Sequence, residues 1–197
     1  MSTKSTTGLD RRAAVATLLA DRRDLAVVTG LGSPSYDVMA AGDHELNYYL
    51  WAAMGSAAMV GFGLAMAQPQ RPVLVVTGDG EQLMGLGGLA TIAVRQPPNL
   101  TVAVLDNGHF GETGLQRSHT GYGLDLSAVA ASCGFGWIET VETADALPAL
   151  RERILARSGL GFATIRVAAD TPTRALPPRD AVYIKTRFRQ ALGFSPS

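Results

Sequence analysis

Two apolar runs that each end in a short polar motif constrain the fold of this chain more than any other feature. Val73–Thr77 is followed by Gly78-Asp79-Gly80, and Leu100–Leu105 is followed by Asn107, with 26 residues between the two motifs. An Asp-Gly pair after an apolar run also begins β-hairpins, which require a second strand directly after the turn. Glu81–Arg95 instead carries its apolar residues at helical spacing, so strand, turn, helix and strand predict a parallel βαβ unit.

In such a unit both motifs lie at the carboxyl edge of the sheet, where α/β proteins bind their ligands. Asp79 offers a carboxylate and Asn107 an amide oxygen. Hard oxygen ligands of this kind suit a magnesium ion that keeps phosphate oxygens in its shell. Gly78 and Gly80 carry no side chain, so the backbone there can approach a phosphate closely. The two motifs therefore predict a site for a metal ion and a diphosphate.

Strands and helices alternate along the rest of the chain. We expect further strands at 25–28, 47–51, 136–140 and 162–167, and further helices at 10–20, 34–40, 55–67, 125–132, 144–157 and 180–192. This alternation predicts a single α/β domain over residues 1–197, with a doubly wound, mostly parallel sheet and helices on both faces. The apolar stretch Tyr48–Ala67 is interrupted by glycines and Ser56, so we interpret it as a strand and a buried helix rather than a membrane span.

The composition narrows the classes of partner. Hydrophobic residues make up 47% of the chain, and 17 basic residues balance 17 acidic ones. This balance gives no reason to expect binding to nucleic acid or to an anionic membrane. The apolar content favours either a large core or burial against a partner chain. Cys133 is the only cysteine, and the N-terminus lacks the apolar core of a signal peptide, so we expect a cytoplasmic protein without an internal disulfide.

A polar, glycine-rich segment of 18 residues, 106–123, begins at the second motif. Loops of this length in compact domains are usually functional or disordered, and a solvated surface loop is the alternative. Its candidate functional side chains are His109, Glu112, Gln116, Arg117 and His119. Elsewhere, Gly30-Leu-Gly32-Ser-Pro-Ser35 lacks the third glycine of a dinucleotide-binding fingerprint, and the three histidines have no metal-ligand spacing.

Five segments together resemble the pyrophosphate-binding half of thiamine diphosphate-dependent 2-oxoacid decarboxylases. They are Ala53–Ser56, Gly61–Ala67, Thr77–Gly80, Met84–Ile92 and Leu105–Gly114. Within this family the chain is most similar to the β subunits of sulfopyruvate decarboxylases and to the C-terminal half of phosphonopyruvate decarboxylases. The resemblance runs from about Thr29 to Phe135. It implies the thiamine diphosphate-binding fold, with thiamine diphosphate and Mg²⁺ as cofactors.

The resemblance also implies a set of site residues. Asp79, Asn107 and the backbone carbonyl of His109 match the family's magnesium ligands. Gly80 and Glu81 would give backbone N–H groups to the diphosphate at the amino end of a helix. The full set of cofactor-binding residues implied is Gly30, Ser33, Ala52, Met54, Gly78, Asp79, Gly80, Glu81, Asn107 and Gly111.

Met54, His109 and Glu112 are the candidates for a catalytic role. Met54 matches the bulky residue that bends the cofactor, with the Ala52 carbonyl and the Met54 N–H holding the pyrimidine edge, although an ordinary core position is the alternative. We expect the 106–123 loop to close over the cofactor, so that His109, Glu112 and Gln116 face the substrate. His109 is the candidate for proton transfer because imidazole titrates near neutral pH, and a role through its carbonyl alone is the other interpretation.

One part of the family's active site has no counterpart in this sequence. The glutamate that activates the cofactor belongs to a pyrimidine-binding domain, for which 197 residues leave no room. We therefore expect a partner subunit to supply it, in a hetero-oligomer with two of each chain or a multiple, and no activity from this chain alone. The expected reaction is decarboxylation of a short 2-oxoacid to an aldehyde. The alternatives are a carboligase, acyloin lyase or acetolactate synthase-like subunit, an oxidoreductase subunit, and a non-catalytic regulatory subunit.

Overall fold

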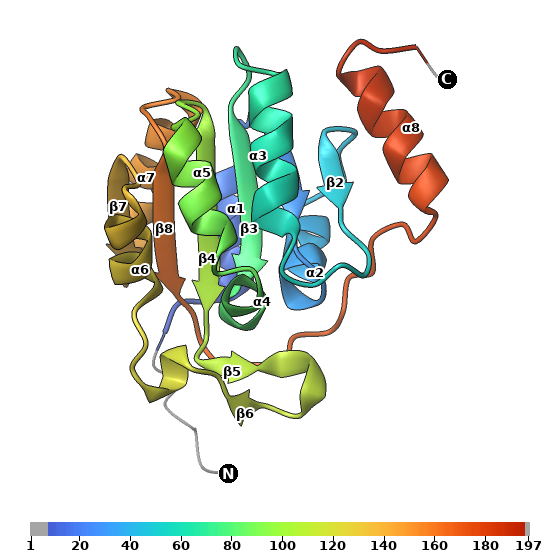
Figure 1. The fold of residues 1–197 in the computed structure, drawn as a ribbon. Coiled ribbons are helices and arrows are strands. Elements are labelled where there is room, and N and C mark those ends of the chain that lie inside the picture. Colours follow the sequence, from blue (N-terminus) through green and yellow to red (C-terminus); the bar gives the residue numbers. More distant parts are fainter. Residues whose placement is uncertain (1–7, 196–197) are drawn as a thin grey trace.

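The computed structural model describes residues 8–195, which contain one six-stranded parallel sheet in the order β2-β1-β3-β4-β8-β7 (Figure 1). The strands are β1 (Ala26–Thr29), β2 (Asn47–Tyr49), β3 (Val73–Gly78), β4 (Leu100–Asp106), β7 (Trp137–Val141) and β8 (Gly161–Arg166). The chain runs from β1 outward to β2 and then returns to place β3 on the other side of β1. The strand order therefore reverses at the carboxyl ends of β1 and β3, the position at which open α/β sheets bind ligands.

Helices cover both faces of this sheet, as the alternation of elements predicts. One face carries α1 (Arg11–Leu19), α2 (Ser33–Ala40) and α7 (Leu147–Leu155), and the other carries α3 (Ala57–Ala67), α5 (Gly88–Arg95) and α6 (Leu126–Cys133). Each layer forms its own hydrophobic core with the sheet. Because β1, β3 and β4 are buried on both faces, their sequences are continuous apolar runs rather than alternating ones. The doubly wound fold is confirmed.

The last helix, α8 (Ala181–Ala191), packs against the edge strand β2. Its buried Phe188 meets Tyr48 of β2 edge to face, with 5.4 Å between the ring centroids. Asp180 caps this helix by accepting hydrogen bonds from the backbone of Val182 and Tyr183. The helix thereby covers a strand edge that is otherwise open to pairing.

Two sequence-based predictions about single elements are wrong in detail. The helix expected at 81–95 is divided into α4 (Asp79–Met84) and α5, because Gly85 packs directly on the loop around Gly55. A Cβ atom on Gly85 would lie 2.0 Å from the Gly55 carbonyl oxygen. The segment 106–123 is not irregular throughout. It forms a two-stranded antiparallel hairpin and two short 3₁₀ turns: β5 (His109–Phe110), η1 (Gly111–Thr113), β6 (Gln116–Arg117) and η2 (Thr120–Tyr122).

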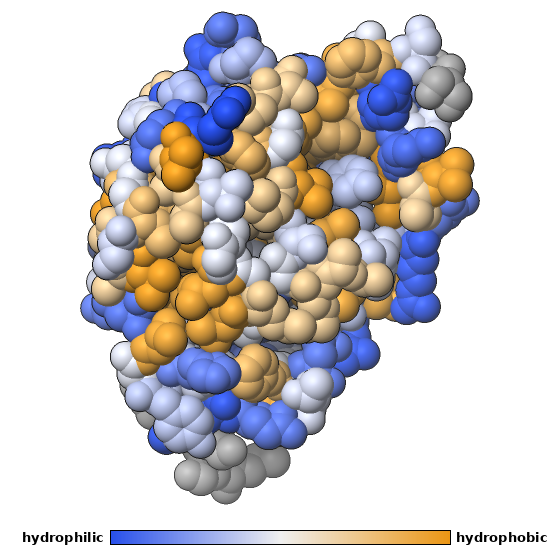
Figure 2. All heavy atoms as spheres, in the orientation of Figure 1, coloured by the Kyte–Doolittle hydropathy of each residue, from blue (hydrophilic) through white to orange (hydrophobic). Residues whose placement is uncertain are grey.

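The helix that the apolar stretch predicts as buried, α3, is only half buried. Its sheet-facing residues are Ala57, Ala58, Gly61 and Ala65, whereas Met66 is 42% exposed. The surface over α3, α4 and α5 is largely apolar in Figure 2, and it includes the exposed side chains of Met54, Met66, Met84 and Val94. We call these four residues the apolar face. Among the helices in residues 8–195, none combines the length and apolar character needed to cross a bilayer.

Candidate active site

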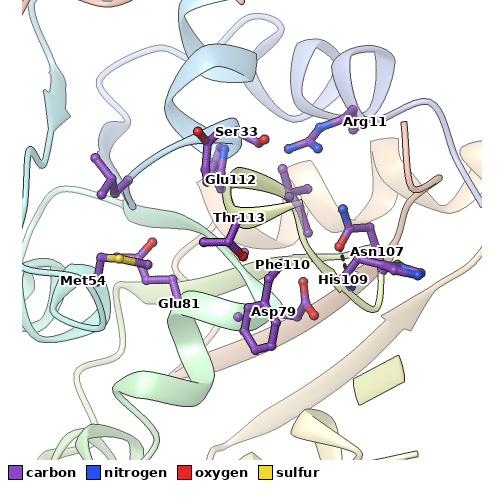
Figure 3. A pocket seen from close by; sticks show the side chains of 16 residues that line it. Arg11, Ser33, Met54, Asp79, Glu81, Asn107, His109, Phe110, Glu112 and Thr113 are labelled. Atoms are coloured by element: carbon purple, nitrogen blue, oxygen red, sulfur yellow. Dashed lines mark hydrogen bonds between the residues drawn. The ribbon is translucent and has the colours of Figure 1, made fainter. Parts of the chain in front are cut away.

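The pocket that contains the predicted site lies at the carboxyl ends of the central strands, below α2 and beside the hairpin (Figure 3). Of the predicted site residues, those that line it are Ser33, Met54, Gly78, Asp79, Gly80, Glu81, Asn107, His109, Gly111 and Glu112. Gly30 and Ala52 do not line it. Segments separated by up to about 80 residues in sequence are thus brought to one cavity by the parallel sheet.

The proposed metal ligands meet because of the strand register. Gly78 at the end of β3 pairs with Leu105 near the end of β4, so Asp79 and Asn107 follow their strands at the same level. The Asn107 side-chain oxygen accepts a hydrogen bond from the His109 N–H at 2.9 Å. The His109 ring nitrogen Nδ1 donates to the Asn107 carbonyl at 2.7 Å (Figure 3). These two bonds fix the backbone turn that carries Asn107 and His109.

A network of hydroxyl groups lies beneath Asp79. Ser118 and Thr120 contact its carboxylate oxygen Oδ2 through their hydroxyls, with Thr120 at 2.9 Å. Thr120 Oγ1 also lies 2.8 Å from a carboxylate oxygen of Asp106, which pairs in turn with Arg166. Thr120 has a single hydroxyl hydrogen, so it cannot donate to both carboxylates at once. The two acidic side chains therefore share one donor.

The charge on Asp79 is disfavoured in this arrangement. Burial raises the pKa of the Asp79 carboxyl, and the neighbouring Asp106 carboxylate raises it further, whereas the hydrogen bonds from Ser118 and Thr120 lower it. A cation placed against Asp79 would offset the first two effects. The carboxylate is thus suited to a positively charged ligand.

The donor set around Asp79 fits a hard cation that is bound together with a phosphate. The pocket offers the Asp79 carboxylate and the Asn107 amide oxygen, and the resemblance implies the His109 carbonyl as a third ligand. No group of three His, Cys, Asp or Glu side chains that would hold a metal is found within residues 8–195. Magnesium prefers six oxygen ligands, so phosphate oxygens and water would have to complete the shell of an ion bound by these residues.

The glycines of the motif differ in their roles. A Cβ atom on Gly80 would lie 2.6 Å from the ring of Phe110, so the hairpin packs where a side chain would otherwise stand. A Cβ atom on Gly78 would have only Pro34 nearby, at 3.7 Å. Packing against the hairpin therefore requires glycine at position 80, whereas no contact within the chain requires it at position 78.

Glu81 has a structural role that its sequence position does not show. Its side chain is buried, and its carboxylate accepts a hydrogen bond from Thr77 at 2.9 Å. Burial raises the pKa of Glu81, while hydrogen bonds from Thr77 and from the backbone N–H groups of Gly55 and Leu31 lower it. The hydrogen bond from Thr77 links α4 to the end of β3. Gly30 makes room for the Glu81 carboxylate, because a Cβ atom there would lie 1.6 Å from Glu81 Oε2.

Met54 lies at the opposite end of the pocket from Asn107 (Figure 3). Its side chain is 49% exposed, which is inconsistent with the alternative that it fills the core. The two residues before it, Ala52 and Ala53, have φ angles of 59° and 50°. Left-handed backbone at non-glycine residues is strained and is found mostly where function requires it. The strained turn presents Met54 to the cavity.

The remaining side chains of the 106–123 segment divide into two groups. His109 and Glu112 line the pocket, and Glu112 pairs with Arg174 at 3.1 Å. Gln116 does not line it, because its amide is bonded to the side chain and the carbonyl of Thr113 within the hairpin. Gln116 therefore lies outside the pocket in this structure, and its contact with a substrate stays a prediction.

Sequence reasoning missed Arg11, Ser118, Thr120 and Asp106 at this site. The sequence predicts functional roles for the charged and histidine side chains of the 106–123 segment, but not for its hydroxyl groups. The serine and threonine that flank His119, at the start of the turn η2, are the only local signal for the network. Arg11 has no local signal, because α1 reaches the pocket only through tertiary packing.

These features define an α/β domain with a ligand pocket at the point where the strand order of a parallel sheet reverses. The chain matches the family described as the thiamine pyrophosphate enzyme, C-terminal TPP binding domain, over residues 31–167. It therefore belongs to this family, and the resemblance inferred from its motifs is confirmed.

Two kinds of curated relative are similar to the chain. It is 38% identical over 183 residues to the sulfopyruvate decarboxylase subunit beta of Methanothermobacter thermautotrophicus, covering 91% of the chain and 94% of the relative. It is 44% identical over 150 residues to the phosphonopyruvate decarboxylase of Streptomyces viridochromogenes, covering 76% of the chain and 37% of the relative. The chain thus spans well under half the length of the phosphonopyruvate decarboxylases it matches.

Solved structures share the fold. A thiamine diphosphate-dependent 4-hydroxybenzoylformate decarboxylase of Rhodococcus jostii has a TM-score of 0.68 at 20% identity, covering 86% of this chain and 34% of that one. A 2-oxoglutarate:ferredoxin oxidoreductase of Magnetococcus marinus also has a TM-score of 0.68, at 17% identity, covering 100% of this chain and 79% of that one. At these identities the likeness shows the fold alone.

Proposed function

We propose that this chain is the small subunit of a heteromeric thiamine diphosphate-dependent enzyme that decarboxylates a short 2-oxoacid to an aldehyde. The observation that carries the proposal is the pocket itself, which has Met54 at one end and the Asp79–Asn107 pair at the other. The similarity to a sulfopyruvate decarboxylase β subunit over nearly the whole length of both chains supports it.

Each wall of the pocket has a defined role in holding the cofactor. Asp79, Asn107 and the His109 carbonyl would bind Mg²⁺, and the free backbone N–H groups of Gly80 and Glu81 in the first turn of α4 would bind the diphosphate. When bound, thiamine diphosphate supplies the carbon that attacks the substrate and the electron sink that carbon dioxide loss requires. Burial of the pocket floor excludes water from the phosphate end.

The pyrimidine end of the cofactor would lie at the Met54 turn. The Met54 side chain, at the exposed end of the pocket, would support the cofactor there. Ala52 is exposed and lies outside the pocket wall, so its carbonyl would reach the pyrimidine only from the rim. The other proposed contacts are those of Ser33, Gly78 and Gly111.

His109 and Glu112 are the side chains of this chain that we place nearest the substrate. The Nδ1–H of His109 is bonded to a backbone carbonyl, which leaves Nε2 as the nitrogen that can exchange a proton. Glu112 is exposed at the rim, where Arg174 orients it. Holding or moving a proton at His109 Nε2 is the catalytic role we propose for this subunit, beside the metal contact through its carbonyl.

A partner chain completes the proposed enzyme. We propose that residues 1–197 form a single pyrophosphate-binding domain, and that the activating glutamate comes from a pyrimidine-binding domain on the partner. Two facts support this division: a relative that the chain covers almost fully is a subunit beta, and the chain covers only 37% of another relative. We propose an assembly with two of each chain or a multiple.

The metal site is tested by replacing Asp79 with Ala. We expect the affinity for thiamine diphosphate in the presence of Mg²⁺ to fall by about a hundredfold or more, because a carboxylate ligand is lost. Titration calorimetry on the chain in complex with its co-expressed partner measures it, and Asp145→Ala, in an exposed turn that does not line the pocket, is the control. Unchanged affinity in Asp79→Ala would refute the site.

Product analysis of the co-expressed pair with a panel of 2-oxoacids separates decarboxylation from carboligation.

A further inference from the structure

Arg11 is the one lysine or arginine side chain within residues 8–195 that is buried, with 4% of its surface exposed. It is the first residue of α1, which Asp10 caps through hydrogen bonds from the backbone of Arg12 and Ala13. Burying a guanidinium is costly unless the charge is paired and its donors are bonded. The position of Arg11 therefore calls for a physical explanation.

Asp37 of α2 compensates the charge of Arg11 but only one of its N–H donors. Arg11 Nε donates to Asp37 Oδ2 at 2.6 Å, and Asp37 is 2% exposed. A guanidinium has five N–H donors, and this bond uses one of them. Within residues 8–195 the two terminal nitrogens of Arg11 make no hydrogen bond. The ion pair holds the side chain in place. It leaves the two terminal nitrogens, which we call the terminal fork, for another acceptor.

The terminal fork faces the active-site pocket. Arg11 lines the same cavity as Ser33, Asp79 and Asn107, and Figure 3 shows its nitrogens directed inward on the side of the Ser33 hydroxyl. In that view Arg11 lies toward the Asn107 end and away from Met54. The phosphate end of the pocket therefore holds a fixed positive charge contributed by α1.

We propose that Arg11, positioned by Asp37, binds a phosphate-type oxyanion inside the pocket. A planar guanidinium fork matches two oxygens of a phosphate, phosphonate or sulfonate group. The inference rests on the proposed function, and its favoured source is the terminal phosphate of the cofactor, because Arg11 shares the end of the pocket where the metal ligands lie. The acidic tail of a substrate has the same chemistry and is the second source to be tested.

The variants must separate loss of the cation from damage to the fold. Arg11→Gln alone leaves the buried Asp37 carboxylate without its partner, which is itself destabilising. The informative comparison is Asp37→Asn against Asp37→Asn with Arg11→Gln, because neither variant leaves a buried carboxylate unpaired. Arg11→Lys keeps the charge without the fork. Arg12→Gln is the matched control, because Arg12 also lies beside Asp37 but does not line the active-site pocket.

The measurement is titration calorimetry on the full chain with three probes: magnesium pyrophosphate, thiamine diphosphate with Mg²⁺, and phosphonoacetate. We expect the double variant to bind pyrophosphate and thiamine diphosphate roughly tenfold to a hundredfold more weakly than Asp37→Asn, as for a hydrogen bond to a charged group. Arg11→Lys should recover part of this loss, and Arg12→Gln should bind like the wild type. Thermal unfolding of each variant establishes that it is folded.

The affinities for the three probes distinguish the two possible sources of the anion and test the role of Arg11. Weaker pyrophosphate binding supports the cofactor phosphate as the ligand, whereas weaker phosphonoacetate binding with unchanged pyrophosphate binding supports the substrate tail. Unchanged affinity for all three probes in a folded double variant overturns the role of Arg11 and leaves the metal site intact. A wild-type chain that binds none of the probes overturns both this inference and the proposed cofactor site.

Discussion

Uncharged hydroxyl groups, rather than other charges, set the position of Asp79. Ser118 and Thr120 approach the same carboxylate oxygen, and Thr120 also contacts Asp106. Such supporting contacts orient the groups that bind a metal and tune their charge. We therefore expect cofactor affinity to depend on residues that would touch neither the proposed metal ion nor the phosphate.

Replacing Thr120 with Val tests this link. The substitution keeps the shape but removes the hydroxyl shared by two buried carboxylates, so we expect a loss of about 1–3 kcal/mol in the free energy of unfolding. Affinity for thiamine diphosphate should fall by roughly tenfold to a hundredfold. Denaturant titration and calorimetry measure the two effects. Thr101→Val, at a buried threonine in β4 with no side-chain hydrogen bond to another described residue, is the control and should change neither quantity much.

At the residue scale, the sequence predicts what is local and misses what depends on packing. Asp79, Asn107 and Met54 belong to short motifs, and the structure places all three at one pocket. Ser118 reaches Asp79 only because the hairpin folds back beneath it, across 39 positions in sequence. Gly30 was expected to contact the cofactor, but its small size accommodates the Glu81 side chain instead.

At the scale of elements, the division between α4 and α5 is the clearest departure from the sequence pattern. Leu83, Leu86 and Leu89 keep helical spacing across the break, so periodicity alone indicates one helix. The break depends on the contact between Gly85 and the Gly55 carbonyl, which joins elements that are distant in sequence. It also holds α4 against the loop that presents Met54.

Gly85→Ala should disturb the site through this contact. A Cβ atom 2.0 Å from the Gly55 carbonyl oxygen forces the two segments apart, and we expect about 1–3 kcal/mol of destabilisation from overpacking. Cofactor affinity should fall as well, because the Met54 turn moves. Gly87→Ala is the matched control, since no atom lies within 4 Å of a Cβ there and φ is −62°. Equal affinity for the cofactor in both variants would contradict the proposed coupling.

At the scale of the whole molecule, the apolar side chains lie in two kinds of environment, the core and the surface. Two buried layers contain most of them, one on each face of the sheet. Part of the remainder forms the apolar face over α3, α4 and α5 (Figure 2). The sequence could not separate these two environments, because α3 is apolar all round and its helical spacing does not show which side packs on the sheet.

The partner chain should cover the part of the apolar face next to the pocket. Met84 is 62% exposed and lies against Gly55, so it adjoins the Met54 turn at the open end of the cavity. A partner that completes the cofactor site has to approach this end, and a charge buried there without a pair is unfavourable. We expect Met84→Glu to weaken the complex with the co-expressed partner by more than about tenfold. Light scattering of the purified pair measures the assembly, with Val182→Glu on α8, 68% exposed, as the control. A Met84→Glu complex of wild-type mass and affinity would show that the partner binds elsewhere.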